Sequence, residues 1–472
     1  MNWQSSFSKD NKRVNPDKDW DFASGDAQPG LAVWETYIHR TELRPANGER
    51  TADLNTGKPK YSFIDSTKIN YKKNGITLDE YWNVLDEDNE IGSAYVFAHK
   101  NKHEVLYAAK TNLVEYNYVK QYFPTDTELQ AAGNRGAAKG LEYFTELTNA
   151  QMCDSEGMSK DSDTSLICLP CSDDASEGAI EIKLAFRKLD ESLGDDPSRF
   201  ITKDVVVFKP VNLLGSEYER VAVTETFGLI GMHIIRKTKN YPAFIFASWE
   251  QVDERNNGIQ TIGLDTVQVN NQMGLTDVEP KRLNPVIERV IPETLQAVNS
   301  AVHQKIRSKN SASKWQYYQL IGVQGTPIDY ENRTSDNNYF MANYVIESDL
   351  KLTNFHGSFG DPFDTSVQNV AFNQQSFNMG GCQGCHGQAQ VSFGTDFSFL
   401  LDFGAGKPTT LPDPYQTCQE ACLATCTKPN GGGIDTDCVK TCTAGCDANI
   451  VSEFTPKKKS EVLAYIKTLD KK

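Results

Sequence analysis

The stretch Leu229-Ile230-Gly231-Met232-His233-Ile234-Ile235 is followed, after a short polar turn, by Ala243-Phe244-Ile245-Phe246-Ala247-Ser248-Trp249. Both runs are rich in β-branched and aromatic residues, which are enriched in strands. Similar runs, separated by turn-forming residues, precede them at 179–186, 204–208 and 219–226. The middle of the chain is therefore predicted to form an antiparallel sheet.

Helical patterns lie on both sides of these runs. One covers about 126–147, and another covers about 292–307, where Leu295, Val298, Val302 and Ile306 recur at helical spacing after Pro292. Residues 1–60 are polar and are expected to form an extended arm that begins to order near Leu31. The predicted fold class is α+β, with a large β-rich domain over 61–355.

Length and charge limit the possible functions. The chain has 472 residues, more than one hydrophobic core usually supports, so at least two domains are expected. The net charge of −15 argues against a general nucleic-acid binder and favours a protein partner that presents a basic patch. No apolar run is long enough to cross a bilayer, so no transmembrane segment is expected.

The motif Cys382-Gln383-Gly384-Cys385-His386 is a C-x-x-C-H sequence, typical of covalent attachment of a c-type haem. Two thiols about one helical turn apart can add to the two vinyl groups of one porphyrin. The adjacent imidazole then binds the iron from one face. We expect one covalently attached haem c at Cys382 and Cys385, with His386 as the proximal iron ligand.

The same two cysteines could instead form a lone disulfide, a redox-active dithiol or half of a zinc site. A redox dithiol would favour a thioredoxin-like βαβ setting, which the flanking sequence does not suggest. Zinc would require two more Cys or His residues at matching spacing, and no second pair follows in register. The haem interpretation is therefore preferred.

The segments that flank the motif support a haem domain. Residues 366–379 are expected to form a helix, and residues 459–469 a short amphipathic helix that carries Tyr465. This arrangement resembles the class I cytochrome c fold, in which a helix before C-x-x-C-H crosses a C-terminal helix carrying an aromatic residue. The resemblance implies a small all-α, cytochrome c-like domain over 366–472. Aromatic and aliphatic side chains after the motif are its expected pocket lining: Phe393, Phe397, Phe399, Leu400 and Phe403.

The sequence departs from this family in one respect. No Met and no His occurs after His386, so the usual distal methionine is missing. A sixth iron ligand must come from upstream, from an unusual group such as Lys, or be absent. His233 and His356 are the candidate sixth ligands, and methionine ligation would point to Met341 or Met232.

A ladder of cysteines lies between the motif and the final helix. Each half repeats at i, i+4 and i+8, so its thiols form one stripe of a helix. An antiparallel helical hairpin over 418–446 would pair them as nested bridges: Cys418–Cys446, Cys422–Cys442 and Cys426–Cys438. The alternative is a thiolate metal cluster. We interpret the hairpin as a disulfide-stapled insertion in the haem domain.

The remaining cysteines are Cys153, Cys168 and Cys171, of which two are expected to form a bridge and one to be left over. Disulfides persist in oxidising compartments, and covalent haem attachment normally takes place outside the cytoplasm. No signal peptide is visible at the N-terminus. We therefore expect a periplasmic or extracellular protein whose signal has been removed.

These observations rank three functions. The first is an exported mono-haem c-type cytochrome that transfers electrons to or from a redox partner. The second is a haem enzyme or small-ligand sensor with an open sixth coordination site. The third is a structural protein that haem merely buttresses. The segments 231–253 and 341–349 also resemble ones in long exported bacterial proteins with a single C-terminal C-x-x-C-H.

Overall fold

The structure is a computed structural model of the whole chain. It describes the following residues: 13, 31–54, 58–62, 81–87, 95–98, 103–139, 166–173, 177–210, 220–254, 260–262, 291–326, 343, 345–347, 369–372, 375–378, 381–402, 426 and 435–442.

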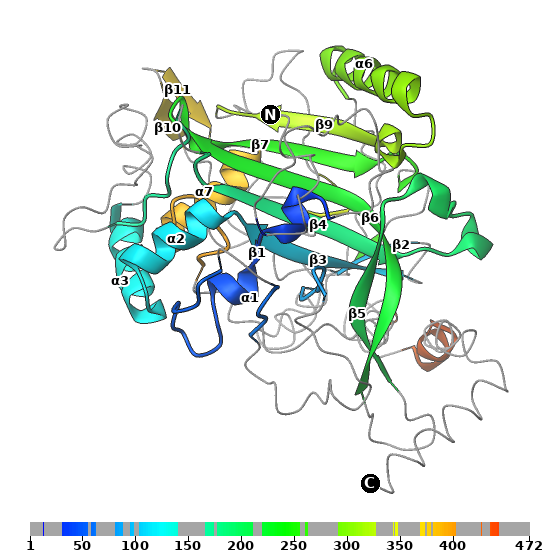
Figure 1. The fold of residues 1–472 in the computed structure, drawn as a ribbon, viewed down its shortest axis with the longest axis horizontal. Helices are drawn as coiled ribbons and strands as arrows, with labels where there is room; N and C mark the ends of the chain where they lie inside the picture. Colours follow the sequence, from blue (N-terminus) through cyan, green and yellow to red (C-terminus); the bar gives the residue numbers. More distant parts are fainter. Residues whose placement is uncertain are drawn as a thin grey trace, which may run out of the picture.

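The described part of the chain is built around one antiparallel sheet (Figure 1). Its strands are β1 (Ile38–His39), β2 (Tyr95–Ala98), β3 (His103–Thr111), β4 (Ile180–Lys188), β5 (Thr202–Pro210), β6 (Arg220–Thr238), β7 (Tyr241–Gln251), β8 (Gln260–Ile262) and β9 (Tyr318–Gln324). The order is β8-β2-β3-β4-β6-β7-β9, with β1 paired to β3 and β5 to β6. The predicted antiparallel sheet is confirmed.

Helices accompany the sheet, as the α+β prediction requires. They are α1 (Arg40–Leu43), α2 (Leu113–Tyr122), α3 (Asp126–Lys139), α6 (Glu293–Lys309) and α7 (Gly381–Phe393), with 3-10 turns η3 (Val33–Thr36), η6 (Glu191–Leu193), η7 (Pro197–Arg199) and η9 (Lys314–Tyr317). Figure 1 shows α2, α3 and α7 gathered at one end of the sheet and α6 beside β9. No helix in the described ranges has the length and apolar character needed to cross a bilayer.

Two predicted strands, 219–226 and 229–235, are one continuous strand, β6. Gly228, which stands between these two runs, lies within the strand. A Cβ atom there would come within 2.7 Å of the Leu189 side chain. This glycine therefore allows close packing against β6, and the break predicted at this point is wrong.

The two faces of the central strands differ in character. Along β4, Ile180, Ile182 and Leu184 belong to one apolar core, which also contains Met232 of β6. Side chains alternate between the faces of a strand, so the intervening residues of β4 and β6 face the other way. That second face carries polar residues: Glu181, Lys183, His233 and Lys237. It is the face on which α7 packs, because Ile235 shares a core cluster with the cysteines of that helix.

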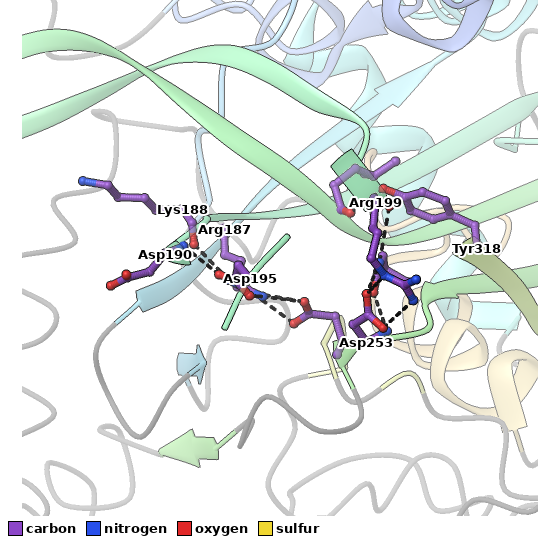
Figure 2. A network of polar contacts seen from close by, with 10 residues as sticks. Arg187, Lys188, Asp190, Asp195, Arg199, Asp253 and Tyr318 are labelled. Carbon is purple, nitrogen blue, oxygen red and sulfur yellow. Dashed lines mark hydrogen bonds and ion pairs between the residues drawn. The ribbon is translucent and has the colours of Figure 1, made fainter. Parts of the chain in front are cut away.

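A polar network, buried around Arg187 and partly exposed around Arg199, ties the loops at one end of β4 and β7 together (Figure 2). The Arg187 guanidinium donates to both oxygens of Asp195 at 2.7 and 2.8 Å and to Glu254 at 2.7 Å. Arg199 makes a similar pair of bonds to Asp253 at 2.6 and 2.7 Å.

The helix predicted over 366–379 is wrong. This segment contains two antiparallel strands, β10 (Asn369–Phe372) and β11 (Gln375–Asn378), with Val370 paired to Phe377. The apolar residues that suggested a helical face, Val370, Phe372 and Phe377, also fit a short hairpin. The second expected helix of the haem domain, 459–469 with Tyr465, lies outside the described residues.

Candidate functional site

The C-x-x-C-H motif occupies the first turns of α7. Gly381, which begins the helix, has a φ of 71°, and a Cβ there would lie 2.5 Å from the Gln324 side-chain oxygen. A residue other than glycine would therefore be strained at this position. Residues three apart lie on the same side of a helix, so Cys382 and Cys385 share one face.

Neither motif cysteine takes part in a disulfide, and both belong to the core shared with β6 and β7. A lone disulfide between them is therefore not what the structure contains. Burial, with the nearby charge of Glu347, raises the pKa of the Cys382 thiol far above its ordinary value. A thiol that stays protonated is a poor nucleophile for disulfide exchange, which disfavours a redox dithiol.

The zinc alternative receives no support from the described residues. Within them, no group of three or more His, Cys, Asp or Glu side chains is arranged to hold a metal ion. Zinc sites use ligands that converge on one tetrahedral centre.

His386 is oriented by a main-chain carbonyl. Its Nδ1 lies 2.7 Å from the Phe397 carbonyl oxygen, and because a carbonyl only accepts, Nδ1 must carry the proton. Burial lowers the pKa of His386 to about 4, so the ring is neutral at physiological pH. Its Nε2 lone pair is then left for a metal, the arrangement that metal-binding histidines commonly use.

Two aromatic rings flank this imidazole. The Phe246 ring of β7 has its centroid 4.8 Å from the His386 centroid, and the Phe399 ring lies at 5.0 Å. Phe397, Phe399 and Leu400, predicted as pocket lining, belong to or pack against the core of the motif cysteines. Phe403 lies outside the described residues.

The motif helix is attached to the sheet by Gln383, a residue that no sequence pattern marks. Its main-chain N–H donates to the Gln324 side chain at 3.2 Å, and its amide lies 3.4 Å from the Ala243 carbonyl. The x positions of a C-x-x-C-H motif are unconstrained by the chemistry, so they carry no signal of such a contact. In the described residues, α7 shares its core with the sheet rather than having one of its own.

A cluster of buried charges lies behind the loop that follows α7. It contains Glu115 of α2, Glu181 of β4, Lys237 of β6 and Asp396. Burial raises the pKa of Glu181 to about 7 and that of Asp396 to about 6. Burial and the charge of Glu181 also raise the pKa of Glu115. The alternation of polar and apolar residues along β4 indicates that one face of the strand is polar. Polar strand faces normally meet water, so the pattern does not indicate that this face is buried.

The candidate sixth ligands have separate positions. His233 lies on the face of β6 that meets α7, and its Nε2 is 3.1 Å from the Glu347 carboxylate. Glu347 also acts on Cys382, so this histidine is on the motif side of the sheet. Met232 belongs to the core on the opposite face. His356 and Met341 lie outside the described residues.

The predicted cysteine ladder can be followed at its inner end. Cys426 and Cys438, the pair predicted as the innermost bridge, form a disulfide with a Cα–Cα distance of 5.5 Å. Cys442 is also disulfide-bonded, and residues 436–442 are helical. The three other ladder cysteines lie outside the described residues: Cys418, Cys422 and Cys446. The stapled hairpin as a whole therefore stays a prediction.

The upstream cysteines are now distinguished. Cys171 is disulfide-bonded, whereas Cys168 is buried and takes part in no disulfide. Of the three cysteines considered for the predicted bridge, Cys171 is therefore in a disulfide, and Cys153 lies outside the described residues.

Comparisons with known proteins do not extend this picture. No protein family, characterised protein or solved structure matches the chain. The chain's own residues are therefore the basis for its function.

Proposed function

We propose that this protein is an exported mono-haem c-type cytochrome that exchanges electrons with a redox partner. Haem would be attached through thioether bonds to Cys382 and Cys385, with His386 on the iron, and would supply one-electron chemistry. The observation that carries the proposal is the hydrogen bond between His386 Nδ1 and the Phe397 carbonyl, directly after two buried cysteines on the same helix.

The donor set fits this group. Both thiols lie on one side of the first turns of α7 and neither is used in a disulfide, as thioether formation requires. The neutral imidazole keeps Nε2 available, and protein control of a bound iron is exerted through such ligand and hydrogen-bond choices. The Cys426–Cys438 disulfide supports an oxidising compartment. The net charge of −15 favours a partner with a basic docking patch.

The experiment is to express the chain with export and haem-attachment machinery and to extract it with acid acetone. We expect the pigment to stay with the polypeptide and the intact mass to rise by one haem. Cys382→Ala/Cys385→Ala should abolish attachment. Cys168→Ala is the matched control, because it removes a buried, non-disulfide thiol of the same core from outside the motif. Loss of all pigment from the unaltered chain on extraction refutes the proposal.

A second function, small-ligand binding at an open sixth position, has one observation in its favour. The His233 imidazole, which could close that position, already has its Nε2 paired with Glu347 at 3.1 Å. A ferric iron that is high-spin and whose ferrous form binds carbon monoxide rapidly would favour a sensor or enzyme. A low-spin iron that becomes high-spin in His233→Ala would identify His233 as the ligand and favour electron transfer.

A further inference from the structure

The loop that presents the Phe397 carbonyl to His386 has an unfavourable backbone. Asp396 has a φ of 55° and Phe397 a φ of 67°, two consecutive non-glycine residues in the left-handed region. In this region the Cβ atom crowds the following carbonyl oxygen. Conformations of this kind persist only where surrounding contacts hold them. The contacts that hold this loop therefore also fix the position of the proximal histidine.

Those contacts converge on the Asp396 side chain. Its carboxylate is ion-paired with the Lys237 ammonium, and both side chains are completely buried. The same carboxylate oxygen accepts a hydrogen bond from the Leu169 main chain at 2.6 Å. The Asp396 main-chain N–H donates to the Gln390 side chain of α7 at 2.9 Å. Strand β6, the segment around residue 169 and the motif helix thus meet at one residue of the loop.

We propose that Lys237 is a positioning residue for the haem site. Through Asp396 it holds the Phe397 carbonyl against His386 Nδ1 and so tunes the reduction potential of the iron. This inference rests on the proposed haem function. It assigns to the large sheet a direct part in the electron-transfer properties of a motif that is distant in sequence, since Lys237 lies on β6 and His386 on α7.

The direction of the effect follows from the hydrogen bond. A carbonyl that accepts from the far nitrogen of a metal-bound imidazole makes that ligand more basic. A more basic ligand stabilises ferric iron relative to ferrous iron. Loosening the loop should therefore raise the reduction potential.

The test is the double variant Lys237→Met/Asp396→Asn in the haem-loaded chain. It replaces an ion pair by two neutral groups, so the net charge of the protein does not change. We expect the equilibrium for reduction to shift about tenfold toward the ferrous form, or about 59 mV for a one-electron couple. The matched control is Arg199→Met/Asp253→Asn, which removes an ion pair from the loops at the end of β4 and β7. It should leave the potential unchanged.

Two further variants separate positioning from folding. Lys237→Arg keeps the charge and should retain most of the wild-type potential. Asp396→Asn alone keeps the side-chain shape and is the substitute if the double variant does not fold; because it also removes a negative charge, its test is the His386 nitrogen chemical shift and not the potential. A potential equal to wild type in the folded, haem-loaded double variant overturns the inference and leaves the proposed function intact.

A measurement on the haem-free chain distinguishes failure of the positioning role of Lys237 from failure of the proposed haem function. In the Cys382→Ala/Cys385→Ala chain, the nitrogen chemical shifts of His386 should report a proton on Nδ1. That signal should change when Lys237 and Asp396 are also replaced. If the wild-type chain takes up no haem, the proposed function fails and this signal still reports the positioning of His386. An unchanged signal overturns the positioning role of Lys237.

Discussion

Two buried charge clusters on the same sheet differ in how well their charges are matched. At one end of β4, Arg187 is surrounded by Asp195 and Glu254, and each carboxylate receives direct guanidinium hydrogen bonds (Figure 2). Burial by itself would lower the pKa of Arg187, but its bonds to Asp195 and the charge of Glu254 raise it instead. In this arginine cluster, which consists of Arg187, Asp195 and Glu254, both carboxylates therefore receive hydrogen bonds.

The acid cluster behind the motif is poorly matched. Three carboxyl groups, Glu115, Glu181 and Asp396, are buried together, and of these Asp396 is ion-paired with the buried ammonium of Lys237. One oxygen of Asp396 has no hydrogen-bond partner in the described part of the chain. Natural proteins keep few such groups, and those that persist call for an explanation. We infer that the arginine cluster serves stability, whereas the acid cluster positions the loop beside the motif.

Removal of Arg187 should have the largest effect on folding. Arg187→Met leaves Asp195 and Glu254 buried without their cation, and we expect a loss of about 3–5 kcal/mol in the free energy of unfolding. Urea denaturation measures this loss. Arg199→Met is the control: its pair with Asp253 is partly exposed, so about 0–1 kcal/mol should be lost. Equal losses in the two variants would show that the arginine cluster is not the stabilising one.

The acid cluster should show the opposite behaviour, with a pH signature. Because the pKa of Glu181 is raised to about 7 in the folded chain, the folded state holds a proton that the unfolded state loses near its ordinary pKa of about 4.3. Stability from this group is therefore present at low pH and is lost as pH rises through about 7. We expect Glu181→Gln to be more stable than wild type by up to about 3 kcal/mol at pH 8. The advantage should shrink toward pH 5.

The measurement is the difference in unfolding free energy between Glu181→Gln and wild type across pH 5 to 8. Taking a difference cancels the opposing contribution of His386, whose pKa is lowered. Asp253→Asn is the control, because the pKa of Asp253 is lowered by its bond to Arg199 and its titration lies below this window. A difference for Glu181→Gln that does not vary with pH contradicts the assignment of the acid cluster.

The sequence was informative where a local pattern decides the structure. Runs of β-branched residues predicted β4 and β7, and the spacing of Leu295, Val298 and Val302 predicted α6. The pairing of Cys426 with Cys438 followed from helical periodicity. The motif predicted two cysteines about one helical turn apart, and both lie in the first turns of α7.

Tertiary contacts decided what the sequence could not. Glu181 and Lys237 alternate with apolar residues as solvent-facing residues do, yet both are buried, on the face whose core includes side chains of α2 and α7. Likewise, nothing local indicates that the Phe397 carbonyl meets His386, because a main-chain acceptor has no sequence signature. Residues 369–378 form a hairpin and not the predicted helix. In so short a segment, the spacing of the apolar residues fits the periodicity of a helix and that of a strand.

A glycine lies beside each of the two charge clusters, and replacing each one tests the difference between the clusters. Gly194, beside the arginine cluster, has a φ of 102° and no atom within 4 Å of an added Cβ, so Gly194→Ala should cost only backbone strain, about 1–2 kcal/mol. Gly394, which begins the loop of the acid cluster, has a φ of 62°, and an added Cβ would collide with the Gly133 carbonyl oxygen. Gly394→Ala must also push α3 from the loop, which adds about 1–3 kcal/mol.

The two alanine variants should therefore differ by about 2 kcal/mol in urea denaturation. The two variants should also differ in their effect on His386, because the loop that Gly394 begins contains the Phe397 carbonyl that orients this histidine. In haem-loaded protein, Gly394→Ala should raise the reduction potential, whereas Gly194→Ala should leave it at the wild-type value. If both variants lose the same stability and keep the wild-type potential, the loop tolerates displacement. The distinction between a stabilising cluster and a site-positioning cluster would then no longer hold.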